Sequence, residues 1–478
     1  MKKINIVLTI FIAAFFFSCS EDFLDQSPSS SQLPEEINSL QEVELLVRGT
    51  YNSLQSADYY NGSFIMKNDV RADDMGLING SRLDDEYDFD YDANSFDSDM
   101  WKVLFTAIRK ANSCLYFLDK ITVEKEEDIE KKQELIGHAR ALRALFHFDL
   151  ARIFAKQYPL AGDADLGIPI VEEVLGEYDF LQRNTVKETY QFIVDEFEAA
   201  IPMLGTSRKD GFLNAYGVKA LLSRVYLYME NNPKAYELAT DVIENSPYKL
   251  IINKEYVNSW SSTSTSESIL SVINSAEDNG GGESVANISD PDSYGSFGSA
   301  KSFVSFMSAD VNDVRYNLLQ ESKSSKRPNG RVLKYPGIGN TLSVVEAYLK
   351  GDGPLNSATN TSSVPVIRLS EVYLIAAEAA VKNNDKPNAI KYLNPIVERG
   401  NPANTVAEAD VNLDCVLEER RKELVAEGHR FFDLIRNKRN IVRETKTVLE
   451  YTDDLAVFPI PQEEMNVNGD HMIQNSGY

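Results

Sequence analysis

The sequence has few of the residues that bind metals or form disulfides, with three cysteines and four histidines among 478 residues. Cys114 and Cys415 lie far apart in helix-like stretches, and we expect two free thiols rather than a disulfide. His138 and His147 are too far apart to be adjacent ligands on one helix face, and no cysteine accompanies them. The sequence therefore predicts neither a metal site nor a cofactor.

Basic residues are also scarce. The chain has 48 Lys and Arg against 73 Asp and Glu, a formal net charge of −25. Such a chain repels phosphate backbones and anionic lipid headgroups, which excludes nucleic acid as a partner and electrostatic docking to a membrane. Hydrophobic residues make up 43% of the chain and aromatic residues 10%, enough to bury a large core.

The chain has an apolar run at its start, Ile6 to Phe17, that is too short to span a bilayer as a helix. Two lysines precede the run, and a small residue and Cys19 follow it, which is the layout of a secretory signal. We expect residues 1–18 to be a signal peptide, Cys19 to carry a lipid, and the polar residues 19–35 to form a flexible leash. The alternative is an ordinary cleaved signal with a chance cysteine.

Helical periodicity dominates both ends of the remaining chain. Two stretches, 216–244 and 371–397, read as helix pairs joined by short Asn-rich turns, and they resemble tetratricopeptide repeats. The pattern predicts an all-α fold with a tetratricopeptide-like scaffold. We expect a helical region over 36–245 and a second over 368–478 that packs on the first as one interleaved domain. The other helices are predicted at 35–56, 101–120, 131–156 and 186–204.

The pattern breaks over residues 246–367, where we expect a loop-rich insertion with short strands near 269–273 and 331–335. Gly280-Gly281-Gly282 lies in this insertion and reads as a flexible loop, because no phosphate-binding motif surrounds it. Residues 58–98 likewise lack a helical period and read as long loops rich in aromatic, Asp and Asn residues. Such loops on a helical scaffold are typical of recognition surfaces.

Exposed aromatic rings in these two regions would bind the C–H faces of a sugar, and nearby polar side chains would bind its hydroxyls. The alternative for each ring is a core position, which we favour for Trp101 because it lies within an amphipathic helix. The predicted ligand-binding residues are Tyr87, Tyr91, Asn94, Trp260, Tyr294 and Phe297.

The stretch 417–436 combines carboxylates at four-residue intervals (Glu419, Glu423, Glu427) with several arginines and His429. Paired carboxylates beside a histidine could form an acid/base site. A helix would bring the arginines close to the carboxylates and keep them charged. We therefore predict a structural ion network here and no catalytic residue.

Several stretches, in this order, resemble the SusD/RagB family of outer-membrane lipoproteins of Bacteroidetes. They are Cys19 to Asp25, Trp101 to Asn112, Arg140 to Leu150, Leu166 to Pro169, Arg368 to Ala379, Glu419 to Leu434, Phe458 to Pro461 and Gln474 to Tyr478. The resemblance covers essentially the whole chain. These stretches belong to the scaffold, so none of them identifies a ligand contact.

The resemblance implies a surface-exposed lipoprotein of the cell outer membrane, anchored through Cys19, that partners a TonB-dependent β-barrel transporter of the SusC type. It implies delivery of glycans to that transporter, or of peptides in the RagB branch, by a protein that binds its ligand without cleaving it. Two other classes stay open from the residues: a lipid-anchored glycoside hydrolase and a helical-repeat assembly protein without a small ligand.

Overall fold

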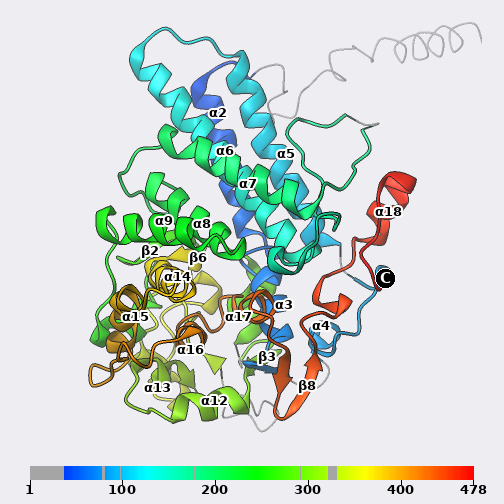
Figure 1. Cartoon of the computed structure of the whole chain (residues 1–478). Coiled ribbons are helices and arrows are strands. Elements are labelled where there is room, and N and C mark those ends of the chain that lie inside the picture. Colours follow the sequence, from blue (N-terminus) through cyan, green and yellow to red (C-terminus); the bar gives the residue numbers. More distant parts are fainter. Residues whose placement is uncertain (1–36, 78–80, 97, 177–178, 291, 321–330) are drawn as a thin grey trace, which may run out of the picture.

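The computed structural model describes the chain except residues 1–36, 78–80, 97, 177–178, 291 and 321–330 (Figure 1). The predicted signal peptide, Cys19 and the leash lie outside the described residues. Helices dominate what is described. In the N-terminal half they are α2 (Leu40–Tyr51), α3 (Ser63–Arg71), α4 (Asp84–Asp88), α5 (Asp99–Lys120), α6 (Glu126–Phe154), α7 (Val186–Ala200), α8 (Ala215–Tyr228) and α9 (Asn232–Asn245).

Helix α6 is the centre of the N-terminal helices, because α2, α5 and α7 all pack against it. Its first turns are polar, whereas nearly every residue from Leu135 to Phe154 is buried. Helix α2 begins at a capping box formed by Ser39 and Glu42, and its buried stripe includes Val43 and Val47. The predicted helices are therefore present, with ends that differ by a few residues.

The C-terminal helices are α14 (Leu369–Lys382), α15 (Lys386–Gly400), α16 (Leu413–Glu423), α17 (Arg430–Arg436) and α18 (Gln462–Asn468). The pairs α8/α9 and α14/α15 are the two predicted repeat-like units, and α14 packs against both α8 and α9 (Figure 1). The all-α, tetratricopeptide-like scaffold is thus confirmed, and the two helical regions share one core. The exact domain limits stay a prediction.

The insertion contains four short helices, α10 (Tyr256–Ser259), α11 (Val285–Ser289), α12 (Lys301–Ser308) and α13 (Leu342–Lys350). The strands of the described residues form two-stranded antiparallel sheets. The pairs are β1 (Met75–Leu77) with β3 (Phe297–Ser299), β2 (Ser268–Val272) with β6 (Val364–Arg368), β4 (Leu319–Gln320) with β5 (Arg331–Val332), and β7 (Ile441–Arg443) with β8 (Lys446–Leu449). Both strands predicted in the insertion exist, the second one shortened.

Two local predictions were wrong. Helix α3 lies where we predicted only loops. Its polar residues Lys67, Asn68, Asp69 and Arg71 are buried together with its apolar ones, so polarity does not mark which face is buried. The motif over 417–436 is not one helix. Helix α16 ends at Glu423, and Ala426 (φ 63°) and Gly428 (φ 76°) turn the chain before α17 begins.

The carboxylates of that motif do form a buried ion network. Glu423 lies 2.6 Å from both Arg368 and Arg399 and 3.1 Å from Arg315, and Glu427 lies 2.7 Å from Arg368. Burial alone would raise the pKa of Glu423, but the three guanidiniums outweigh burial and hold it well below its usual range. The network joins the helical scaffold to the insertion, since Arg315 belongs to the insertion and Arg368 ends β6.

The arginines that we expected to pair with Glu419, Glu423 and Glu427 have other partners. Arg420 donates to Asp433 at 2.8 Å. Arg421 and Arg430 reach back to Asp74 and Asp73, at 2.6 Å and 2.7 Å. Asp73 and Asp74 therefore connect the segment after α3 to the C-terminal segment 421–430 by ion pairs.

Candidate functional site

One exposed aromatic cluster joins the first loop region to the insertion. The Tyr294 side chain is 46% exposed, and the guanidinium carbon of Arg82 lies 4.5 Å from the centroid of its ring. Arg82 also pairs with the exposed carboxylate of Glu283. This hydrogen bond raises the pKa of Arg82, so the cation is retained beside the ring. We call Arg82, Glu283 and Tyr294 the Tyr294 cluster.

The loop that carries the Tyr294 cluster has a defined conformation. Asn287 donates to the Gly282 carbonyl at 2.8 Å and accepts from the Ser293 hydroxyl at 2.8 Å. The amide of Ser296 donates to the Ile288 carbonyl at 2.9 Å. The Tyr294 ring is therefore presented by an ordered turn, which lowers the entropy lost when a ligand binds.

The glycine run fits into this turn instead of forming the free loop that we predicted. Gly281–Glu283 is a short 3₁₀ helix. A Cβ on Gly280 would approach the Asn61 side chain to 2.4 Å, so this position requires glycine. The Asn61 carbonyl accepts from the amide of Val285 at 2.7 Å. Asn61, just before α3, thus positions the loop from the scaffold side.

The other residues predicted in the first loop region lie elsewhere. Tyr91 is buried against Phe458, with ring centroids 4.9 Å apart, and its hydroxyl donates to the Leu455 carbonyl at 2.6 Å. Tyr87 is half-buried beneath Arg443, whose guanidinium carbon lies 3.7 Å from the ring centroid. Asn94 is exposed, in a turn closed by Asp92. Tyr91 is a core residue, so its prediction as a ligand contact was wrong.

The aromatic residues predicted in the insertion also separate. Phe297 is buried in β3, in the hydrophobic core, which corrects its prediction as an exposed ring. Trp260 is partly buried, with Lys334 Nζ 4.6 Å and Arg368 Cζ 5.3 Å from its ring. Of the five predicted rings (Tyr87, Tyr91, Trp260, Tyr294 and Phe297), only Tyr294 has an exposed side chain.

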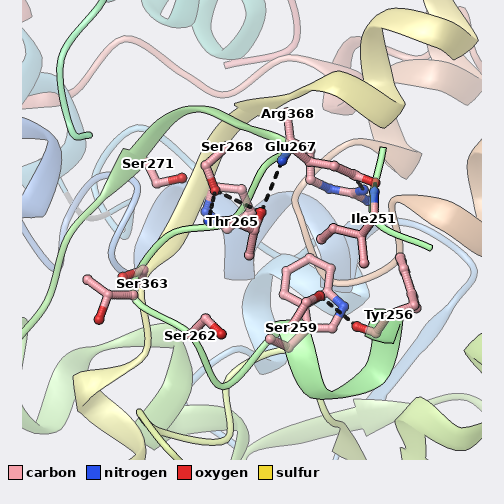
Figure 2. Close-up of a pocket in the computed structure, with 13 residues that line it drawn as sticks. Ile251, Tyr256, Ser259, Ser262, Thr265, Glu267, Ser268, Ser271, Ser363 and Arg368 are labelled. Atoms are coloured by element: carbon pink, nitrogen blue, oxygen red, sulfur yellow. Dashed lines mark hydrogen bonds and ion pairs between the residues drawn. The ribbon is translucent and has the colours of Figure 1, made fainter. Parts of the chain in front are cut away.

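Trp260 lines a cavity rich in serine and threonine, shown in Figure 2 together with Glu267 and Arg368. Its volume of about 50 Å³ is room for one or two waters, at roughly 30 Å³ each. The Trp260 Nε1 has no hydrogen-bond partner in the protein. This cavity is too small for a sugar ring, so a sugar cannot pack against Trp260 there.

Arg82, Glu283 and Asn287 were missed by reading the sequence. A single arginine or glutamate in an irregular loop carries no periodicity or spacing that distinguishes it. Only the fold brings residue 82 to residues 283 and 294, through the β1–β3 pairing next to them. The glycine run was the one usable signal, because a close backbone approach requires it.

Two buried carboxyl groups, Asp69 and Asp74, have raised pKa values but are shielded from solvent. Burial raises the pKa of Asp69 well above its usual range, and burial together with Asp73 raises that of Asp74 to about 6. Neither residue lines the cavity beside Trp260, and Asp74 pairs with Arg421. Among the described residues no group of three His, Cys, Asp or Glu could hold a metal ion, and no helix could cross a membrane.

The comparison with protein families gives two matches that follow each other along the chain. The family described as "Starch-binding associating with outer membrane" matches residues 22–227, and the "SusD family" matches residues 335–478. The unmatched stretch between them includes most of the loop-rich insertion.

Relatives and solved structures agree with these matches. A SusD superfamily protein from Bacteroides vulgatus is 33% identical, with a TM-score of 0.84, and the match covers 92% of this chain and 99% of that one. The SusD-like protein P25 of Formosa agariphila is 24% identical over 98% of this chain and 97% of its own length. The chain belongs to the SusD family.

A more distant structure shares the fold alone. Surface glycan-binding protein A from Bacteroides thetaiotaomicron, solved in complex with laminarihexaose, is 19% identical with a TM-score of 0.72, covering 91% of this chain and 99% of that one.

Proposed function

We propose that this protein captures glycans at the Tyr294 cluster on the cell surface and delivers them to a TonB-dependent transporter in the outer membrane. The single observation that carries the proposal is the exposed Tyr294 ring beside Arg82 and Glu283 in an ordered turn. A ring of this kind packs against the C–H face of a pyranose, while the guanidinium and carboxylate bind hydroxyls.

Neutral glycans suit the charge of the chain. At −25 the protein attracts no anionic polymer, yet a neutral ligand meets no repulsion. The family description names starch, and a structure with the same fold holds a laminarin oligosaccharide. Both support a glycan, and we propose a neutral glucan as the first ligand to test.

Binding without cleavage is part of the proposal. A glycoside hydrolase needs two carboxyl groups at a sugar-sized groove, one of them with a raised pKa. Of the described carboxyl groups with a raised pKa, Asp69 and Asp74 are buried and Glu464 lies on α18, and none of them belongs to the Tyr294 cluster. The cluster itself has one carboxylate, Glu283, paired with Arg82.

The anchor and the partner complete the proposal. A lipid on Cys19 would hold the domain at the outer membrane, and the polar residues 19–35 would let it reach a transporter embedded beside it. Tethering also raises the effective concentration of captured glycan at the transporter, without any new contact.

The test is binding of laminarin and soluble starch, measured by affinity electrophoresis and calorimetry, to the wild type and to Tyr294→Ala. We expect about a tenfold loss of affinity in the variant, equivalent to about 1.4 kcal/mol. Tyr116→Ala is a matched control, because Tyr116 is 50% exposed and has Lys120 Nζ 3.8 Å from its ring centroid, but lies on α5. Equal losses in both variants, or binding of basic peptides and no glycan, would contradict the proposal.

A further inference from the structure

A cavity of about 270 Å³ lies at the C-terminal end of α6, where the chain leaves that helix. It is about five times larger than the 50 Å³ cavity beside Trp260. Small-molecule sites range upward from about 300 Å³, so its size fits a ligand of one ring. Its walls come from the segment after α6, from α17 and from the segment after β8: Lys156, Gln157, Leu160, Ile435, Tyr451, Thr452, Asp453, Asp454, Ala456 and Val457.

Apolar groups form the inner wall of the cavity. Ile435 of α17, Ala456 and Val457 are buried, and Leu160 is partly buried. The partly buried Tyr451 adds an aromatic side chain. Such a wall favours a ligand with an apolar face.

Gln157 lines the same cavity and holds an unused acceptor. Its side chain is only 3% exposed, and its Nε2 donates to the Arg152 carbonyl at 2.8 Å. The Oε1 of Gln157 is buried and has no hydrogen-bond partner in the protein. An unpaired buried acceptor is unfavourable, and a donor from a ligand or a water would offset this cost.

The exposed side of the cavity is also rich in acceptors. Asp453 and Asp454 are exposed, and Thr452 lies next to them with its hydroxyl. Lys156 is the one cation among the lining residues, held at 3.0 Å by Asp165 with 43% of its side chain exposed. A ligand of this cavity must therefore supply hydroxyl or amine donors to the acceptors. The positive charge of Lys156 would repel a ligand that carries an ammonium group. A neutral polyol with an apolar face satisfies both conditions.

We infer that this cavity is a second carbohydrate site, which binds a single pyranose unit. It shares no residue with the Tyr294 cluster, whose members come from residues 82, 283 and 294. The inference extends the proposed function, since one site would hold the glycan chain and the other a single ring, and it stands without the first site. Gln157 and the two aspartates accept from hydroxyls, while Tyr451 and the apolar wall contact the C–H face.

The test uses saturation-transfer NMR with methyl glycosides of glucose, galactose, mannose and xylose at about 10 mM, above a millimolar Kd. At least one glycoside should give a signal with the wild type and with Tyr294→Ala. Thr452→Trp changes an exposed residue at the cavity and should weaken that signal at least tenfold, whereas Glu450→Trp, two residues away and outside the lining, should not. Gln157→Leu, with its melting temperature checked, should weaken it as well.

Three results would overturn the inference: no signal from any glycoside, an unchanged signal in Thr452→Trp, or loss of the signal in Tyr294→Ala. Preferential binding of lysine amide would also overturn it, because the ligand would then be cationic. Loss of laminarin binding in Tyr294→Ala concerns only the first site, so the two proposals fail independently.

Discussion

Replacing Glu423 by Gln removes the charge at the point where the insertion is fastened to the helical scaffold. Glu423 is fully buried and lies 2.6 Å from Arg368, 2.6 Å from Arg399 and 3.1 Å from Arg315. It also accepts from the Tyr256 hydroxyl at 3.0 Å. Glutamine keeps the shape and loses the charge, so three buried guanidiniums lose a shared counter-ion.

The magnitude follows from the cost of breaking a buried ion pair, about 3–5 kcal/mol. Glu427 and Glu267 still face Arg368, and Asp313 still faces Arg315, so we expect the lower end, about 3 kcal/mol. A loss of 1 kcal/mol lowers Tm by about 2–4 °C in a domain of 150–250 residues, and by less in a larger protein. We therefore expect the Tm of Glu423→Gln to fall by about 3–10 °C.

The assay is thermal unfolding at pH 7 followed by tryptophan fluorescence. The chain has two tryptophans, and Trp260 lies 5.3 Å from Arg368 while Trp101 is buried in the α5 helix. We expect an altered Trp260 signal before unfolding as well as a lower Tm. Glu463→Gln removes an exposed partner of Lys102 and should leave Tm unchanged. If Glu423→Gln and Glu463→Gln melt alike, the network does not hold the insertion.

Three further predictions concern acid stability, a backbone turn and the anchor. Burial would raise the pKa of Glu371, but the ion pair with Arg224 outweighs burial and lowers this pKa from 4.5 to about 2. The charged Glu371 therefore contributes about 3 kcal/mol to the free energy of unfolding. This contribution is complete above pH 4.5 and is lost as the pH falls toward 2. Glu371→Gln should therefore flatten the dependence of Tm on pH between 5 and 2, and an unchanged slope would contradict this assignment. Gly428→Ala should lower the free energy of unfolding by about 1–3 kcal/mol, because Gly428 has a φ of 76° and a Cβ there would lie 3.2 Å from the Ile65 Cα. Gly353→Ala is the control: a Cβ there meets nothing within 4 Å, so its Tm should be unchanged. Cys19→Ala should move the protein from membrane to soluble fractions on immunoblots, and retention in the membrane would refute the lipid anchor.

The helical scaffold could be predicted because its signals are local. The three- and four-residue spacing in α5 follows from one buried face, and short Asn-rich turns mark the helix pairs. Helix α3 could not be predicted, since its nine residues are few and its polar residues are buried together with its apolar ones, so polarity does not mark the buried face.

The candidate site was predicted in part. Tyr294 lies among glycine and serine residues, which have no large apolar side chains to bury it, so its exposure could be predicted. Phe297 has similar neighbours in sequence but is buried in the core, and Tyr91 is covered by Phe458, far away along the chain. Arg82 meets Tyr294 only through tertiary contacts, which no local pattern encodes.

The central claim is that the Tyr294 cluster binds a glycan. Isothermal titration of laminarin into the wild type, Tyr294→Ala and Tyr116→Ala tests it most directly. We predict saturable binding to the wild type and to Tyr116→Ala, with affinity about tenfold lower in Tyr294→Ala at an unchanged melting temperature. Equal affinity in all three proteins, in a titration where laminarin does bind, would contradict the claim.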